Sequence, residues 1–154
     1  MIVTIKINSK SKFKNFTLTF LITLTALATG AVQAHGDVTP QAVDTAGLPE
    51  LGAEWVETNP FRESGEYREL AIEIGASAYN QNCARCHGLQ AISGGIAPDL
   101  RVLEEDYDGD AWYIERVTNG AVRDGRVYMP PFVGLINQEG LWAIRTYIDS
   151  RPED

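Results

Sequence analysis

The stretch "NQNCARCHG", residues 80–88, holds both cysteines of the chain, and a histidine follows the second cysteine directly. Cys83 and Cys86 lie three positions apart, so on one helical turn their side chains face the same way. Three kinds of chemistry use such a group: a redox disulfide, part of a zinc site, or the covalent anchor of a c-type haem. The rest of the sequence has to distinguish them.

For two of these chemistries, the rest of the sequence does not supply what they require. A thioredoxin-like redox motif needs a βαβ setting, which the sequence does not indicate, and so short a loop between the cysteines makes a poor structural staple. A structural zinc site takes four ligands. Beyond Cys83, Cys86 and His87, the chain offers only His35 as a further histidine or cysteine. The sequence therefore favours a haem that Cys83 and Cys86 hold covalently, with His87 as an axial ligand of the iron.

Met129, in the stretch "VYMPPF", is the candidate for the second axial position. It lies 42 residues after His87 and is the only methionine besides Met1. Two consecutive prolines follow it and favour an extended, stiff loop, which suits a weak thioether ligand. A lone methionine also serves as core filling. If Met129 stayed off the iron, an open sixth position would suit a haem enzyme or a gas sensor instead.

The first 34 residues have the pattern of a secretory signal peptide. Lysines 6, 10, 12 and 14 precede an apolar and threonine-rich run at 16–32, and small residues at 32 and 34 suit a cleavage site. An uncleaved membrane anchor is the alternative. Cleavage leaves nine arginines against 21 acidic residues, a formal charge of −12, and places His35 at a solvated terminus. This acidity argues against nucleic acid or anionic membrane as partner and, with the signal peptide, predicts a periplasmic protein.

The remaining chain reads as an arm followed by one small domain. Residues 35–65 are rich in proline, glycine and acids, and we expect an extended arm that Trp55 and Phe61 fix to the domain surface. Residues 66–154 form the domain. Helices are predicted over 66–81, over 110–119 with Asp110 as the cap, and after the cap residue Asn137. No stretch predicts a sheet. The expected fold is all-α, with three or more helices and long loops.

Four segments together resemble a class I bacterial cytochrome c: "GASAYNQNCARCHG", "APDL", "MPPF" and the closing "LWAIRTYIDS", over about residues 66–151. The resemblance implies one covalent haem c in a class I fold. It also implies that the carbonyl of Pro98 accepts a hydrogen bond from His87 Nδ1. It further implies that Gly75 and Tyr79 pack against the last helix near Tyr147.

The acidic balance and the long arm are similar to those of periplasmic cytochromes that accept electrons from quinoprotein (PQQ-dependent) alcohol dehydrogenases in pseudomonads. This resemblance implies a monomeric one-electron carrier rather than an enzyme, which passes electrons toward a terminal oxidase or another cytochrome. The cytochrome bc1 complex is the alternative donor.

Three smaller patterns bear on the site. Residues 104–115, "EEDYDGDAWYIE", fit some positions of a calcium loop, although an acidic run ahead of a helix is the simpler interpretation. Trp112 and Arg101 are candidates for binding a haem propionate. Three arginines close in sequence to the ligand segments are candidates for a basic rim near the haem edge: Arg85, Arg123 and Arg126.

Overall fold

The computed structural model describes residues 39–63 and 65–152, so the predicted signal peptide (1–34) and His35 lie outside the described residues. Its elements are α2 (Arg68–Asn82), α3 (Ala84–His87), η1 (Leu89–Ala91), α4 (Tyr107–Asn119), β1 (Ala121–Arg123), β2 (Arg126–Met129) and α5 (Gln138–Asp149). None of the helices in the described part of the chain has the length and apolarity needed to cross a bilayer.

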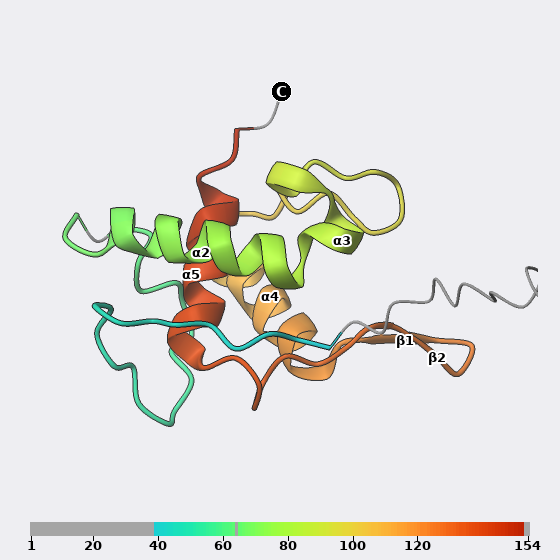
Figure 1. Ribbon diagram of the computed structural model, residues 1–154, viewed down its shortest axis with the longest axis horizontal. Coiled ribbons are helices and arrows are strands. Elements are labelled where there is room, and N and C mark those ends of the chain that lie inside the picture. Colours follow the sequence, from blue (N-terminus) through green and yellow to red (C-terminus); the bar gives the residue numbers. More distant parts are fainter. Residues whose placement is uncertain (1–38, 64, 153–154) are drawn as a thin grey trace, which may run out of the picture. The chain divides into compact units, whose positions relative to one another are not determined.

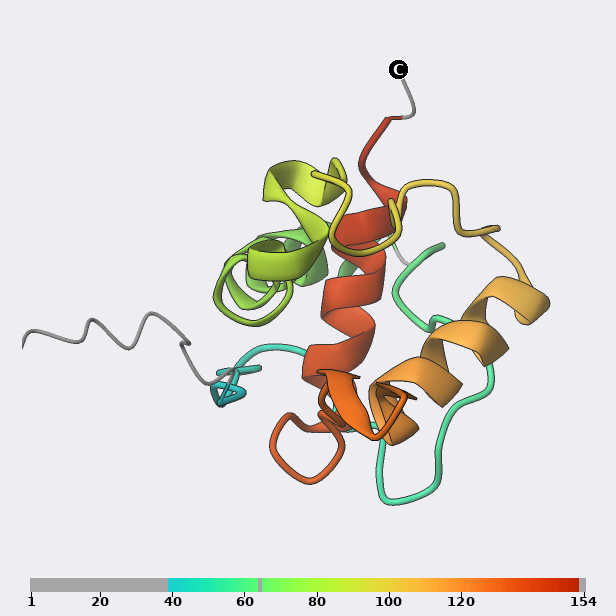
Figure 2. The same cartoon turned by 90° about the vertical axis from the view of Figure 1, so that its right-hand side faces the viewer.

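Helix α5 lies at the centre of the domain, with α2 on one side and α4 on the other (Figures 1 and 2). Asn137 caps α5 as predicted, because its side chain accepts a hydrogen bond from the Gly140 amide at 3.0 Å. Helix α2 packs closely on α5 at Gly75, where an added Cβ would overlap the carbonyl of Ala143. The rings of Tyr79 and Tyr147 lie 5.3 Å apart beside this contact. The implied packing of Gly75 and Tyr79 near Tyr147 is therefore confirmed.

Helix α4 begins earlier than the sequence predicted. Asp106, not Asp110, is the cap, and its side chain accepts a hydrogen bond from the Gly109 amide at 3.0 Å. Asp110 lies within the first turn and is fully buried. The helix ends at Asn119, and Gly120 follows it as expected, with a positive φ of 67° that suits glycine. Asp106 and Asp110 are both residues that favour the cap position, so the sequence alone could not show which of them begins the helix.

The prediction that no segment forms a sheet was wrong. Strands β1 and β2 pair as an antiparallel hairpin. Asp124 and Gly125 connect them, with φ values of 50° and 73°. Positive φ at both central residues is the geometry that twists a two-residue turn to match its strands, and Asp-Gly is a preferred pair for it. The signal was present in the sequence as "VRDGRVY".

The arm preceding α2 packs more deeply than a surface strap. The Leu51 amide donates to Glu139 Oε1 at 2.7 Å, and the Val56 amide donates to Gln138 Oε1 at 2.7 Å, so the start of α5 holds the arm. Trp55 packs edge-on against Trp142, with ring centroids 6.2 Å apart, as expected for a residue that fixes the arm. Phe61 is only 1% exposed and belongs to the core rather than to the surface.

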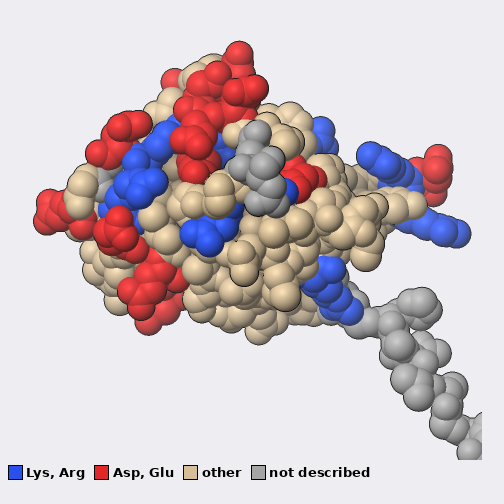
Figure 3. All heavy atoms as spheres, turned by 90° about the horizontal axis from the view of Figure 1, so that it is seen from above, with Lys and Arg blue, Asp and Glu red and all other residues tan. Residues whose placement is uncertain are grey.

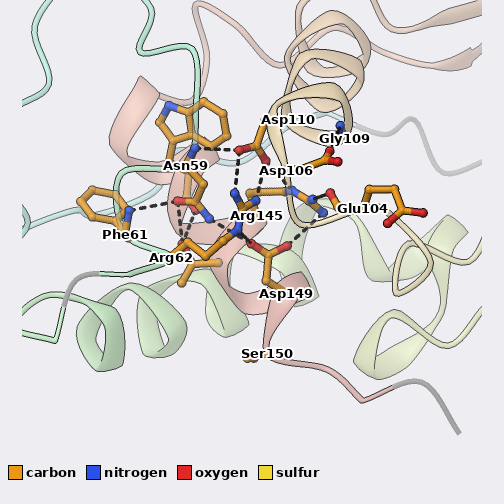
Figure 4. A network of polar contacts seen from close by, with 12 residues as sticks. Asn59, Phe61, Arg62, Glu104, Asp106, Gly109, Asp110, Arg145, Asp149 and Ser150 are labelled. Carbon is orange, nitrogen blue, oxygen red and sulfur yellow. Dashed lines mark hydrogen bonds and ion pairs between the residues drawn. The ribbon is translucent and has the colours of Figure 1, made fainter.

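A buried ionic cluster joins the arm to both α4 and α5 (Figure 4). Arg62 binds Asp110 at 2.6 Å and Asp149 at 3.0 Å. Arg145 binds the same two carboxylates, each at 3.0 Å. The backbone amide of Asn59 donates a hydrogen bond of 2.8 Å to Asp110. We call these five residues the ionic cluster. Asn59 and Arg62 lie on the arm, Asp110 on α4, and Arg145 and Asp149 on α5, so the cluster fixes how these three segments meet.

Candidate functional site

A cavity of about 450 Å³ opens between α3, the loop after η1, the end of α4, the hairpin and α5. Its walls include an apolar set: Leu100, Val117, Phe132, Leu141, Ile144 and Ile148. Cys83, Cys86, His87, Pro98 and Met129 also line it, although they span almost 50 positions of the sequence. The fold thus brings the predicted thioether cysteines, the two predicted iron ligands and Pro98 to one apolar cavity.

The short helix α3 arranges the cysteines and the histidine on one turn. The amides of Cys86 and His87 both donate to the Cys83 carbonyl, at 3.1 and 3.0 Å. His87 is 9% exposed, and its Nδ1 lies 2.9 Å from the Pro98 carbonyl oxygen. Because a carbonyl only accepts hydrogen bonds, Nδ1 is the donor in this contact. The contact fixes the orientation of the ring and leaves Nε2 as the nitrogen available to a metal.

Met129 reaches the cavity from the end of β2. Close packing holds its backbone, since an added Cβ at Gly120 would overlap the Met129 carbonyl. After the two prolines, the Phe132 amide donates to the Val117 carbonyl at 2.8 Å and ties the loop to α4. The thioether is thus positioned by the hairpin, the prolines and α4 together.

The comparisons with known proteins agree with this geometry. Residues 70–148 match the family model described as "Cytochrome C oxidase, cbb3-type, subunit III". The chain is 63% identical over 138 residues to Cytochrome c550 of Pseudomonas aeruginosa, which covers 89% of this chain and 95% of that protein. This chain belongs to the cytochrome c family. The family implies covalent haem c and electron transfer.

More distant relatives of this cytochrome c are larger proteins. Quinohemoprotein alcohol dehydrogenase ADH-IIG of Pseudomonas putida is 36% identical over 84 residues, which is 54% of this chain and 11% of that protein. The Cbb3-type cytochrome c oxidase subunit FixP of Rhizobium etli is 32% identical over 87 residues, 53% of this chain and 30% of that protein. No solved structure gives a significant match.

Charged groups on the cavity wall of this cytochrome c differ in part from those predicted. Trp112 lines the cavity, as expected for a propionate contact, whereas Arg101 is not among the described lining residues. Its guanidinium instead holds Asp99 at 2.9 Å and the Pro152 carbonyl at 3.1 Å. Arg116, which the sequence did not single out, lines the cavity beside Trp112, with its guanidinium carbon 5.5 Å from the indole centroid. Its place in the last helical turn before the hairpin was the available signal.

The alternative chemistries gain no support from the site. Burial, and secondly the neighbouring Cys86, raise the pKa of the Cys83 thiol to about 12, so it is a poor thiolate nucleophile. Among the described residues, no group of three or more His, Cys, Asp or Glu side chains is placed to hold a metal ion. Most of 104–115 lies in α4, which Asp106 caps, so the structure agrees with the simpler interpretation of this run as acids at the start of a helix.

Proposed function

We propose that this cytochrome c is a periplasmic single-haem carrier that accepts single electrons from a PQQ-dependent alcohol dehydrogenase and passes them toward a terminal oxidase. The observation that carries the proposal is that Cys83, Cys86, His87 and Met129 converge on one apolar cavity. Two ligands would fill both axial positions, which leaves no place for a substrate. The similarity to named quinohemoprotein alcohol dehydrogenases supports the class of donor.

Each residue has a defined part in this proposal. When bound, haem c supplies one-electron redox chemistry. Cys83 and Cys86 would hold the macrocycle through thioethers, and His87 and Met129 would bind the iron. Pro98 would keep the His87 ring in its tautomer and orientation. The apolar walls exclude water, and methionine ligation together with that burial favours a raised reduction potential.

The proposed processing follows the sequence prediction. Residues 1–34 would be removed as a signal peptide, 35–65 would form the arm, and 66–154 would form the haem-binding domain of a monomer.

The ligand assignment is tested by spectroscopy of the purified holoprotein. We expect the denatured protein to retain its haem, the oxidised protein to show the weak near-infrared band of methionine–iron ligation, and the reduced protein not to bind carbon monoxide. Met129→Ala should lose the band and bind carbon monoxide. Leu135→Ala, an exposed position in the following loop, is the matched control and should behave like wild type. A wild-type protein that binds carbon monoxide readily contradicts the carrier assignment.

The donor is tested separately, by stopped-flow reduction with a purified PQQ-dependent alcohol dehydrogenase. We expect rapid reduction that slows as the salt concentration rises, because an electrostatically guided encounter is screened. Reduction by the bc1 complex and not by the dehydrogenase would reassign the donor and leave the carrier function in place.

A further inference from the structure

The β1–β2 hairpin exposes an unusual run of side chains next to the Met129 segment. All seven residues from 122 to 128 are exposed. Three of them are large and apolar: Val122 is 63% exposed, Val127 67% and Tyr128 58%. Exposed apolar residues that gather in one place mark interaction sites more often than those scattered singly.

Two arginines face each other across this hairpin. Arg123 and Arg126 are direct partners in the strand register. Like charges directly opposite each other on two strands destabilise the pair. Among the described side chains, no carboxylate forms an ion pair with either arginine, and this includes Asp124 in the turn between them. The hairpin therefore carries a repulsion that a negatively charged partner would relieve.

Part of the hairpin surface also borders the cavity. Arg123, Val122 and Tyr128 line the cavity mouth as well as the hairpin surface. Arg123 also lies over the Tyr128 ring, 5.9 Å from its centroid, so the two side chains form one continuous surface. A protein bound on the hairpin would therefore sit next to the proposed haem site, where electron transfer requires a short path.

The rest of the molecule has the opposite charge. The whole chain has a formal charge of −8, whereas residues 121–129 contain two arginines and a single aspartate. Figure 3 shows mostly basic side chains projecting at the hairpin end, on the right, while most acidic side chains lie at the left and along the top, with basic ones among them. This asymmetry would orient the protein in the field of an acidic partner before contact.

We propose that the β1–β2 hairpin is the docking surface for the electron donor and that it binds an acidic, partly apolar surface beside the cofactor opening of that donor. Arg123 and Arg126 guide and orient the encounter, and Val122, Val127 and Tyr128 are covered on contact. The proposal rests on the electron-carrier function proposed above, but not on the identity of the dehydrogenase.

The test compares two double charge reversals of equal size in the holoprotein. Arg123→Glu/Arg126→Glu alters the hairpin. Arg68→Glu/Arg151→Glu is the matched control, since these residues lie at the start of α2 and just past α5, away from the hairpin (Figure 1). Unchanged haem absorption and thermal unfolding establish that each variant is folded.

Two reagents report on the surface. Ferricyanide, an anion that takes one electron from the reduced protein and becomes ferrocyanide, probes the local charge without a protein partner. A purified PQQ-dependent alcohol dehydrogenase probes docking. At low ionic strength, we expect the hairpin variant to react with each about tenfold more slowly than wild type, with little change in the control. The difference should shrink at high salt.

Equal slowing by both variants would overturn the proposal, because net charge rather than the hairpin would then set the rate. A hairpin variant that reacts as fast as wild type overturns it too. If the dehydrogenase does not reduce wild-type protein at all, the donor assignment fails, and the ferricyanide ratio alone then decides whether the hairpin is the charged surface beside the electron exit.

Discussion

Two sides of helix α5 have opposite chemistry although the helix is buried along almost its whole length. On one side, Ile144 and Ile148 line the apolar cavity. One position further along from each, Arg145 and Asp149 belong to the ionic cluster. The first side leaves space for a cofactor and supplies only apolar contact. The second side carries Arg145 and Asp149, which pair with each other and with Asp110 and Arg62 of other segments.

The charges on the ionic side persist because each carboxylate has several donors. Burial acts to raise the pKa of Asp110, but hydrogen bonds from Arg62, the Asn59 amide and Arg145 outweigh it, and the pKa lies below its usual value. Such a cluster adds little net stability over a well-packed apolar core. The cluster instead provides conformational specificity, since only one placement of the arm and α4 on α5 satisfies all of its partners.

The largest effect is expected from Arg145→Met, which breaks the ionic side. Arg145 is 0% exposed, and its loss would leave Asp110 and Asp149 to share Arg62. Removing one partner from a buried pair costs about 3–5 kcal/mol. We expect a fall of that size in the free energy of unfolding of the holoprotein, measured by urea denaturation.

The matched change on the cavity side is Ile144→Val, one residue away on the same helix. Removing a single buried methylene costs about 0.5–1.5 kcal/mol. If both variants lose the same free energy, the contrast between the two sides of α5 is not energetic, and the ionic cluster would be no more than a substitute for apolar packing.

The second prediction concerns the contact of α2 with α5, where space rather than charge sets the limit. Gly75→Ala would push a methyl group into the Ala143 carbonyl and toward Tyr147. Overpacking of this kind costs about 1–3 kcal/mol. Gly65→Ala is the control, because an added Cβ there meets nothing within 4 Å. Thermal unfolding of both variants measures the difference, and equal midpoints would show that the helices separate freely.

The features that the sequence predicted are those encoded in short stretches. "CARCH" specified the cysteines and His87, and "MPPF" singled out Met129. The structure gathers these residues around one cavity, while their ligand roles remain predictions. The Asn137 cap was equally local, and the structure confirms it.

The features that it missed fall into two kinds. The ionic cluster joins Asn59 to Asp149, 90 positions apart, and no local pattern marks which charges will meet. The hairpin is different, because Asp124 and Gly125 form a preferred turn pair and the signal for it is local. The start of α4 was missed because Asp106 and Asp110 are both good caps, and only tertiary burial distinguishes them.

The smallest effect is expected from Asp99→Asn, which tests a charge on the loop that follows the cavity residue Pro98. Hydrogen bonds from the Arg101 side chain, and then from the amides of Arg101 and Ser93, lower the pKa of Asp99 to about 2. A carboxylate whose pKa falls on folding stabilises the folded protein at pH values above its unfolded pKa, which is 3.8 for Asp99. That stabilisation is lost as the pH falls through the folded pKa.

Because Asp99 is partly exposed, solvent screens it, and we expect a loss of about 1 kcal/mol for the variant at pH 6. In urea unfolding at pH 2, most of the difference between wild type and variant should disappear, because the pH has then fallen to the folded pKa of Asp99, well below the unfolded value. The other carboxylates titrate in both proteins and cancel in the difference. A loss that stays constant down to pH 2 would assign the effect of Asp99 to packing rather than to its charge, and would leave the ionic cluster as the charged element that matters for stability.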